Sequence, residues 1–315
     1  MWTYVVRRLI AFVPTAFIAI TLIFILTRLA PGNPVWALIG DQSVPAEKID
    51  EVVKELGLDR PIWLQYVTWL PKALTGDLGY SLFYRKPVLE VILDRFPITL
   101  TIAGFSTILT ILLALPIGIL SAIRQNSITD NLSMVFSTVW ISLPSFWLGF
   151  LFIIVFSVFL RWFPSSGYRE LSFGAWPWFS RLVLPVLALS LAHIALLVRM
   201  TRSSMLEVLG NEYIVAARAK GLTEVKVLYK HALRNAFISI ITVIGLIFAL
   251  SLGGSVIIES VFAIPGLGQL VTTAALRRDY PIIEGGILYL TFISLAVNLL
   301  VDVSYTLINP KITYE

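Results

Sequence analysis

Six long apolar stretches constrain this chain more than any other feature. A helix needs about 20 apolar residues to cross the hydrocarbon core of a membrane. The stretches are 9–29, 98–123, 132–160, 182–198, 237–258 and 282–308. The fourth is short and contains His193, and the sixth contains Glu284 and Asp302. With 57% hydrophobic and 14% charged residues, the chain is predicted to be an all-α integral membrane protein with six transmembrane helices.

The composition also excludes several kinds of function. The chain has no cysteine, so disulfides, thiolate metal sites and a cysteine nucleophile are excluded. Two histidines are too few for a histidine-built metal cluster. No acid–base pair or Ser/His/Asp arrangement is evident, so no catalytic residue and no metal site are assigned. The net charge of +5 is attributed to basic loops on the cytoplasmic side of the membrane. No nucleic-acid partner is therefore expected.

The positions of the basic residues predict the orientation. Arg7 and Arg8 precede the first apolar stretch, which is longer than the core of a signal peptide and is read as a retained helix. With these arginines inside, 30–97, 161–181 and 259–281 lie outside, and the basic segment 199–236 lies inside. Both termini are then cytoplasmic, in a multi-pass protein of the cell membrane.

Three regions follow: an N-terminal transmembrane helix at 1–29, an external insertion at 30–97 and a core at 98–315 with the other five transmembrane helices. The insertion is predicted to be helical at 44–56, again from Pro61, and at 88–96. It is either a small cap on the rim of the bundle or a surface for an external partner. Prolines within the spans predict kinks, among them Pro144 and Pro185.

The segment 199–236 combines seven basic residues with helical periodicity. Apolar residues recur at three- and four-residue steps over 203–220, which predicts an amphipathic helix. Gly221 is expected to end that helix, and Thr223 to cap a second helix with Glu224 in its first turn. We interpret the segment as a docking element for a cytoplasmic partner; the alternative is a basic surface loop that merely follows the positive-inside rule.

The motifs of the chain resemble those of permease subunits of binding-protein-dependent ABC importers, in the dipeptide, oligopeptide and nickel branch. The stretch EYIVAARAKGL followed by HALRNA resembles the EAA loop of that family. Further motifs in matching order are RRL, APGNP, TGDLGYS, RFPITLTIA, LPSFWLG, RSSMLEVL, ESVFAIPGLGQL, RRDYPIIEGG and NLLVDVSYTLINPKI. The chain looks like the first permease of the pair. Val215 stands where the general loop has glutamate, which is compatible with the peptide branch.

The resemblance implies an architecture and a set of partners. A second homologous permease completes the pathway, two cytoplasmic ATPase subunits hold ATP and Mg, and an external binding protein delivers the solute. A cytoplasmic coupling helix between the fourth and fifth spans contacts the ATPase. The implied coupling residues are Ala216, Ala217, Arg218, Ala219, Lys220, Gly221 and Leu222. The chain has no G-x-x-x-x-G-K-[ST] motif, so it is expected to be a transport subunit without a cofactor of its own.

Polar and small residues within the spans are candidates for the pathway, because polar groups at membrane depth face protein or water. Possible pathway or gate residues are Gly253, Gly254, Ser255, Glu259 and Asn298. Helix packing is the alternative for the small residues. Asp302 is expected to form an ion pair with Arg199 or Arg202 at the inner rim, and solute contact is its alternative.

The expected function is half of an import pathway for a peptide-type solute, coupled to ATPases through 199–236. The same architecture could carry oligosaccharides or nickel. An alternative of another class is a stand-alone ion-coupled carrier, which predicts paired charges at mid-membrane; the spans hold almost none.

Overall fold

The fold is described from a computed structural model. It covers residues 2–29, 54, 59–81 and 83–308, and the helix expected at 44–56 lies outside these residues apart from Lys54. The elements are α1 (Trp2–Leu29), α4 (Ile62–Leu74), β1 (Tyr80–Ser81), β2 (Lys86–Pro87), α5 (Val88–Ile123), α6 (Ile128–Ser142), α7 (Ser145–Phe152), η1 (Ile153–Phe159), η2 (Leu171–Phe173), α8 (Ala175–Leu209), α9 (Glu212–Ala219), α10 (Glu224–Lys226), η3 (Val227–Leu233), α11 (Arg234–Val261), α12 (Leu267–Arg277) and α13 (Tyr280–Ile308).

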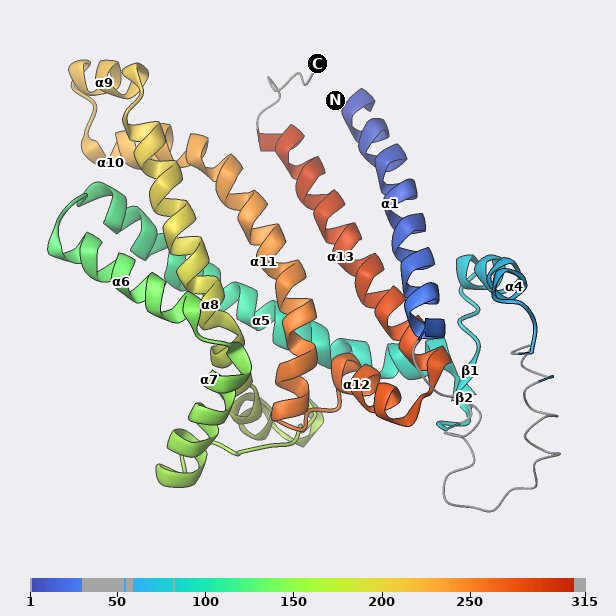
Figure 1. Ribbon diagram of the computed structural model, residues 1–315. Coiled ribbons are helices and arrows are strands. Elements are labelled where there is room, and N and C mark those ends of the chain that lie inside the picture. Colours follow the sequence, from blue (N-terminus) through green and yellow to red (C-terminus); the bar gives the residue numbers. More distant parts are fainter. Residues whose placement is uncertain (1, 30–53, 55–58, 82, 309–315) are drawn as a thin grey trace.

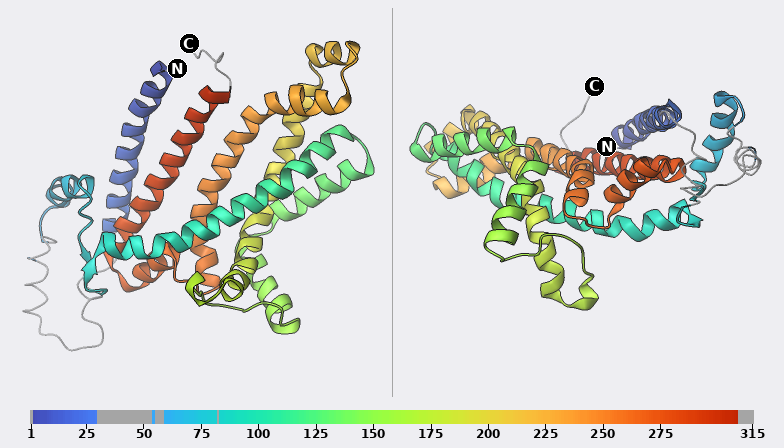
Figure 2. Two further views of the ribbon diagram at one scale, coloured as in Figure 1. Left: turned by 180° about the vertical axis from the view of Figure 1, so that it is seen from behind. Right: turned by 60° about the horizontal axis from the view of Figure 1, so that its bottom comes forward.

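The long helices lie side by side and are tied together by α5 (Figure 1). This helix of 36 residues crosses the others diagonally and packs against α6, α8, α11 and α13. At one edge α1 packs on α13, and at the other edge α6 and α7 pack on α8. The two further views show the same spread-out arrangement (Figure 2). The short hairpin of β1 and β2 is antiparallel, pairing Tyr80 with Pro87.

Five helices are long and apolar enough to span a membrane, and a sixth span is obtained if one bent pair counts as a single crossing. That pair is α6 and α7 with η1, which meet at an angle of 96°. The kink expected at Pro144 within the span 132–160 is confirmed, and it is a full break of the helix at Leu143 and Pro144. Proline cannot continue the backbone hydrogen bonds of α6, and it forces the preceding Leu143 into an extended conformation, with ψ 127°.

Two other predicted helix boundaries differ from those in the structure. The expected short helix at 88–96 and the span at 98–123 form one helix, α5, in which Pro97 is accommodated. The fourth span does not end at Val198, because α8 continues to Leu209. The second predicted helix of the insertion is present as α4.

Buried polar contacts close the end of the molecule that carries α12. Glu259 of α11 is fully buried; its Oε1 accepts a hydrogen bond from Thr99 Oγ1 at 2.6 Å, and its Oε2 accepts one from the backbone N–H of Gln269 at 2.9 Å. Thr99 Oγ1 in turn accepts from the backbone N–H of Leu267 at 2.8 Å. Glu259 thus binds the first turn of α12, where orphan N–H groups need acceptors.

At the same end, two further buried carboxylates hold α1 and the β1–β2 hairpin in place. Glu284 of α13 accepts hydrogen bonds from Arg28 at 2.5 Å and from Thr27 at 2.9 Å. Asp279 precedes α13 and accepts from Ser81 Oγ at 2.5 Å. Burial raises the pKa of the Asp279 carboxyl, and the hydrogen bond from Ser81 opposes that shift.

Candidate coupling surface

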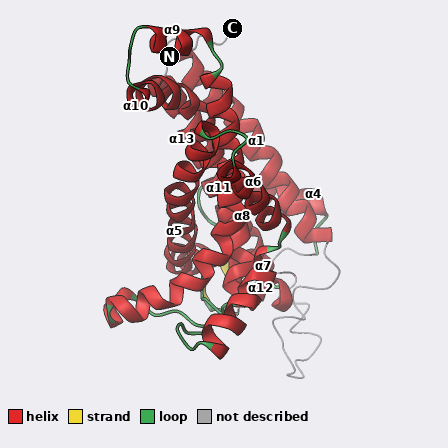
Figure 3. Cartoon of the chain, turned by 90° about the vertical axis from the view of Figure 1, so that its left-hand side faces the viewer, coloured by secondary structure: helices red, strands yellow, loops and turns green. Residues whose placement is uncertain are grey.

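The helix α9 projects at the end of the molecule where α1 begins and α13 ends (Figure 3). It is a short helix between two breaks. Gly210 caps α8, and Gly221 follows α9 with φ at +75°. The backbone N–H of Gly221 donates to Arg218 O at 2.9 Å, and that of Leu222 donates to Ala217 O at 3.4 Å. This pair of bonds is the Schellman motif, which requires a left-handed residue after the helix. The prediction that Gly221 caps a helix is confirmed.

The predicted start of that helix is wrong. The apolar periodicity of 203–220 belongs to two helices, because 203–209 is the last part of α8 and α9 begins at Glu212. Thr223 does precede α10 with Glu224 in the first turn, but its side chain makes no capping hydrogen bond.

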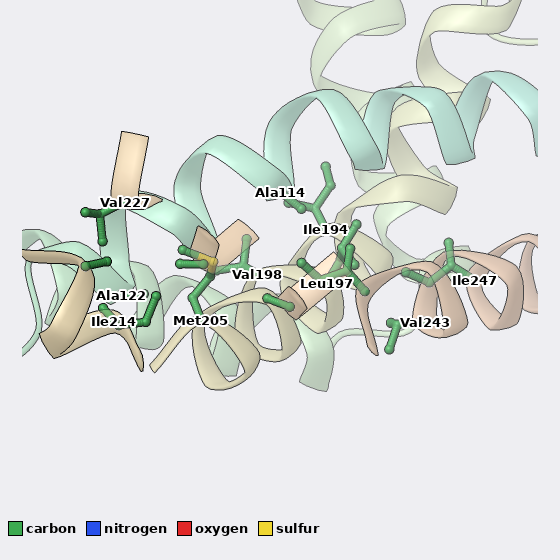
Figure 4. Close-up of a cluster of buried hydrophobic side chains, with 14 residues drawn as sticks. Ala114, Ala122, Ile194, Leu197, Val198, Met205, Ile214, Val227, Val243 and Ile247 are labelled. Atoms are coloured by element: carbon green, nitrogen blue, oxygen red, sulfur yellow. The ribbon is translucent and has the colours of Figure 1, made fainter. Parts of the chain in front are cut away.

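The inner face of α9 joins the hydrophobic core. Ile214 is fully buried and Ala217 is 8% exposed. Figure 4 shows Ile214 beside Val227 of η3, with Ala122 of α5 and Met205 of α8. Leu222 packs against the same cluster. Because three long helices contribute to this cluster, α9 is attached to the membrane helices through packing as well as through its two connections.

Two polar contacts at the protein surface connect α9 to α11 and to α10. Asn235 of α11 donates a hydrogen bond to the Tyr213 hydroxyl at 2.8 Å. The Arg218 guanidinium forms a two-bond ion pair with Glu224, at 2.9 and 3.3 Å. Exposed ion pairs contribute little stability, about 0–1 kcal/mol. This pair nonetheless closes the loop around Gly221.

The outer face of α9 is small and apolar, and it is uncovered within the described residues. Val215 is 59% exposed, and Ala216 and Ala219 are also exposed. On the following α10 and η3, Val225 is 66% and Tyr229 62% exposed. Sequence periodicity places Val225 on the apolar side of the second helix, but it does not single out Tyr229, because it cannot show which side of a helix its neighbours leave open. We define the coupling face as Val215, Ala216, Ala219, Val225 and Tyr229.

The expected inner-rim ion pair has a different acid. Arg202 Nε and Nη2 donate to the two carboxylate oxygens of Asp130 at 2.6 and 2.7 Å. Asp130 also accepts from Ser121 Oγ at 2.5 Å and from the backbone N–H of Asn126 at 2.9 Å. The prediction named Arg199 or Arg202 as the partner of Asp302. It is wrong for Arg202, since Asp130 accepts from both Nε and Nη2 of that guanidinium, and the pairing with Arg199 stays a prediction. Arg199 is exposed.

The pathway candidates separate into two groups. A Cβ on Gly254 would lie 2.8 Å from Leu189 Cδ1, Ser255 donates to Leu252 O, and Glu259 binds α12, so these three are packed inside. Gly253 has no atom within 4 Å of a built Cβ, and Asn298 is exposed on α13.

An exposed stripe runs along α11 through Gly253. Its members are Leu246, Leu250, Gly253, Ile257 and Ser260, all exposed at three- and four-residue steps. The other sides of α11 pack against α5, α7, α8, α12 and α13. This stripe is the one long face of α11 that the described residues leave open.

Comparison with protein families assigns the chain. Its residues 114–314 match the model of the binding-protein-dependent transport system inner membrane component, and residues 1–103 match the N-terminal model of the same kind of protein. The chain belongs to this family. It is therefore a permease subunit of an ABC importer and a multi-pass inner membrane protein, and ATP hydrolysis belongs to separate subunits. This finding favours the importer over the stand-alone carrier.

Named relatives are similar over the whole chain. The glutathione transport system permease protein GsiC of Escherichia coli O6:H1 is 40% identical over 315 residues, and the alignment covers 100% of both chains. The dipeptide transport system permease protein DppB of Escherichia coli K12 is 37% identical, again with both chains fully covered.

Solved structures share the fold. An inward-facing MetNI methionine ABC transporter aligns with a TM-score of 0.58 at 17% identity, covering 70% of this chain and 96% of that one. A second crystal form of the same transporter gives a TM-score of 0.54 at 18% identity.

Proposed function

We propose that this chain forms half of an import pathway for a peptide-type solute and is driven by cytoplasmic ATPases through α9. The observation that carries the coupling role is the two-sided construction of α9. Its inner face is buried against α5, α8 and η3, and its outer coupling face is free. A partner that pushes on the outer face therefore moves α5, α8 and, through η3, also α11.

In this proposal the residues of the resemblance have two roles. Ala216, Ala219 and Lys220 are exposed and contact the ATPase, whereas Ala217 and Leu222 anchor α9 to the core. Gly221 sets the turn, and Arg218 holds Glu224. The ATPases bind ATP and Mg, a second permease completes the pathway, and an external binding protein delivers the solute. The exposed stripe of α11 and Asn298 line the pathway.

The peptide class is supported by the names of the relatives. One is a glutathione permease and another a dipeptide permease, and both match from end to end. Oligosaccharide and nickel import use the same architecture and are the alternatives. The ligand that co-purifies with the binding protein of the complex decides between them; a sugar or nickel there in place of a peptide overturns the peptide assignment.

The coupling face is tested by changing one small residue on it. Ala216→Asp places a charge on the apolar face, and we expect the ATPases to co-purify less and solute uptake to fall at least about tenfold, the cost of one buried unpaired charge. Ser203→Asp is the control, because Ser203 is also small and exposed but lies on α8. Equal uptake and equal ATPase recovery in both variants would refute the proposed docking face.

A further inference from the structure

An open pocket lies at the end of the molecule opposite α9, between η1, the loop 160–174 and the start of α8. Its volume is about 560 Å³. Three guanidinium groups line it, from Arg161, Arg169 and Arg181, together with Trp162 and Trp176. The coupling role proposed above does not use this pocket.

The three arginines are not neutralised. Within the described part of the chain, none of them forms an ion pair. Glu170 lies beside Arg169 in sequence, but its Oε2 accepts a hydrogen bond from Ser172. Three like charges around one hollow repel each other, so the arrangement favours an anion inside it.

The local backbone holds these cations at the pocket. After η1 the chain turns back: the N–H of Trp162 donates to Phe156 O at 2.8 Å, and Arg161 has a left-handed φ of 55°. Arg181 Nη1 donates to Pro177 O at 3.0 Å, which fixes the side chain over the first turns of α8. The loop is joined to α11 by the N–H of Gly167, which donates to Phe262 O at 2.8 Å.

One serine that lines the pocket has a buried hydroxyl without a hydrogen-bond partner among the described residues. This residue is Ser157 of η1. A buried hydroxyl left unpaired costs free energy, about 1–3 kcal/mol. An anion with several oxygen acceptors would satisfy both this hydroxyl and the guanidinium groups, since arginine binds phosphate oxygens in a two-bond geometry.

The rim of the pocket indicates where the anion comes from. Trp176 is 65%, Trp162 61% and Phe173 67% exposed. Large exposed aromatic side chains at the end of membrane helices gather at the level of the lipid headgroups. Trp162 and Trp176 line the basic pocket, and the Phe173 ring lies 6.0 Å from the Arg169 guanidinium, so an acyl chain can lie on the rings while a phosphate enters the hollow.

We propose that this pocket binds the phosphate group of an anionic membrane phospholipid. Arg161 and Arg181 hold the phosphate oxygens, Ser157 donates one hydrogen bond, and Trp162 and Trp176 contact the glycerol and the first methylenes. The lipid fastens the bent pair α6–α7 with η1 to α8, where the backbone of Ile153–Phe159 is π-helical.

The test uses the purified importer complex in a neutral detergent, titrated with dihexanoyl phosphatidylglycerol. We expect saturable binding, and the double variant Arg161→Gln/Arg181→Gln should weaken the Kd by roughly tenfold or more, because two charge-assisted hydrogen-bond partners are lost. Lys72→Gln removes one exposed charge of α4 and should leave the Kd unchanged. Unaltered binding in the double variant would overturn the site.

Further arms separate the sources of the anion and guard against misfolding. Inorganic phosphate should bind far more weakly than the lipid; equal affinity would assign the pocket to a free anion and overturn the lipid. Loss of binding-protein docking with normal lipid binding would make the pocket a protein interface instead. Arg181→Lys keeps the positive charge but cannot form the two-bond contact of a guanidinium with phosphate oxygens. An intermediate Kd at an unchanged melting temperature therefore supports the assignment even if the double variant unfolds.

Discussion

At the scale of single residues, two adjacent glycines of α11 have opposite surroundings. A Cβ on Gly254 meets Leu189, whereas one on Gly253 meets open space. We expect Gly254→Leu to lower the stability of the chain by roughly 1–3 kcal/mol through overpacking. Gly253→Leu should leave the melting temperature unchanged and reduce solute uptake, because the new side chain enters the proposed pathway. Normal uptake by Gly253→Leu would place Gly253 outside the pathway.

Gly221 is constrained by its backbone and not by its neighbours. No atom lies within 4 Å of a built Cβ, but φ is +75°. An ordinary L-residue pays roughly 1–2 kcal/mol in this conformation, and asparagine pays less. Gly221→Val should therefore insert normally yet separate ATP hydrolysis from uptake, while Gly221→Asn should stay near the level of the unchanged protein. Measuring both rates in vesicles checks this; a Val variant as well coupled as the Asn variant would contradict it.

At the scale of elements, the Asp130–Arg202 ion pair joins the first turn of α6 to α8. The Asp130 side chain is 2% exposed, so Arg202→Ala leaves a buried carboxylate unpaired and should cost about 3–5 kcal/mol. Arg199→Ala, on the same helix and exposed, is the matched control. Thermal unfolding of the purified complex should show a clear loss for Arg202→Ala only. Equal melting temperatures would mean that the pair is not structural.

Hydropathy predicts the helices better than their ends and their partners. A run of apolar residues must be helical in a membrane, since each N–H and C=O needs an internal partner there. The same requirement lets a helix continue past its apolar part, as α8 does to Leu209. The break at Pro144 was flagged as a kink, but its angle depends on packing against α8 and α11. Arg202 is 72 residues from Asp130, so no local pattern indicates their contact.

The candidate site was predictable only where its features have a local signature in the sequence. The glycine that ends α9 has a local signature, and Gly221 was identified from it. The sidedness of α9 is set by α5 and η3, which bury Ile214 and Ala217. Composition could not show that Ala217 faces inward while Ala216, its neighbour, faces outward.

At the scale of the whole molecule, the helices form an open arrangement and not a closed bundle. The edges α1 and α6 lie far apart, with α11 between them (Figure 1). The exposed stripe of α11 is left uncovered by the described residues. A single chain of this shape does not enclose a pathway. The open stripe of α11 therefore fits a subunit whose pathway is completed by a second permease.

The orientation in the membrane can be tested with single cysteines, since the chain has none. Thr223 follows α9 and Ser166 lies in the loop of the basic pocket at the opposite end, and both are exposed. If α9 and both termini are cytoplasmic, a membrane-impermeant maleimide should label Ser166→Cys in intact cells. It should label Thr223→Cys only after the cells have been permeabilised. Labelling of Thr223→Cys from outside would invert the topology and remove α9 from the reach of any cytoplasmic ATPase.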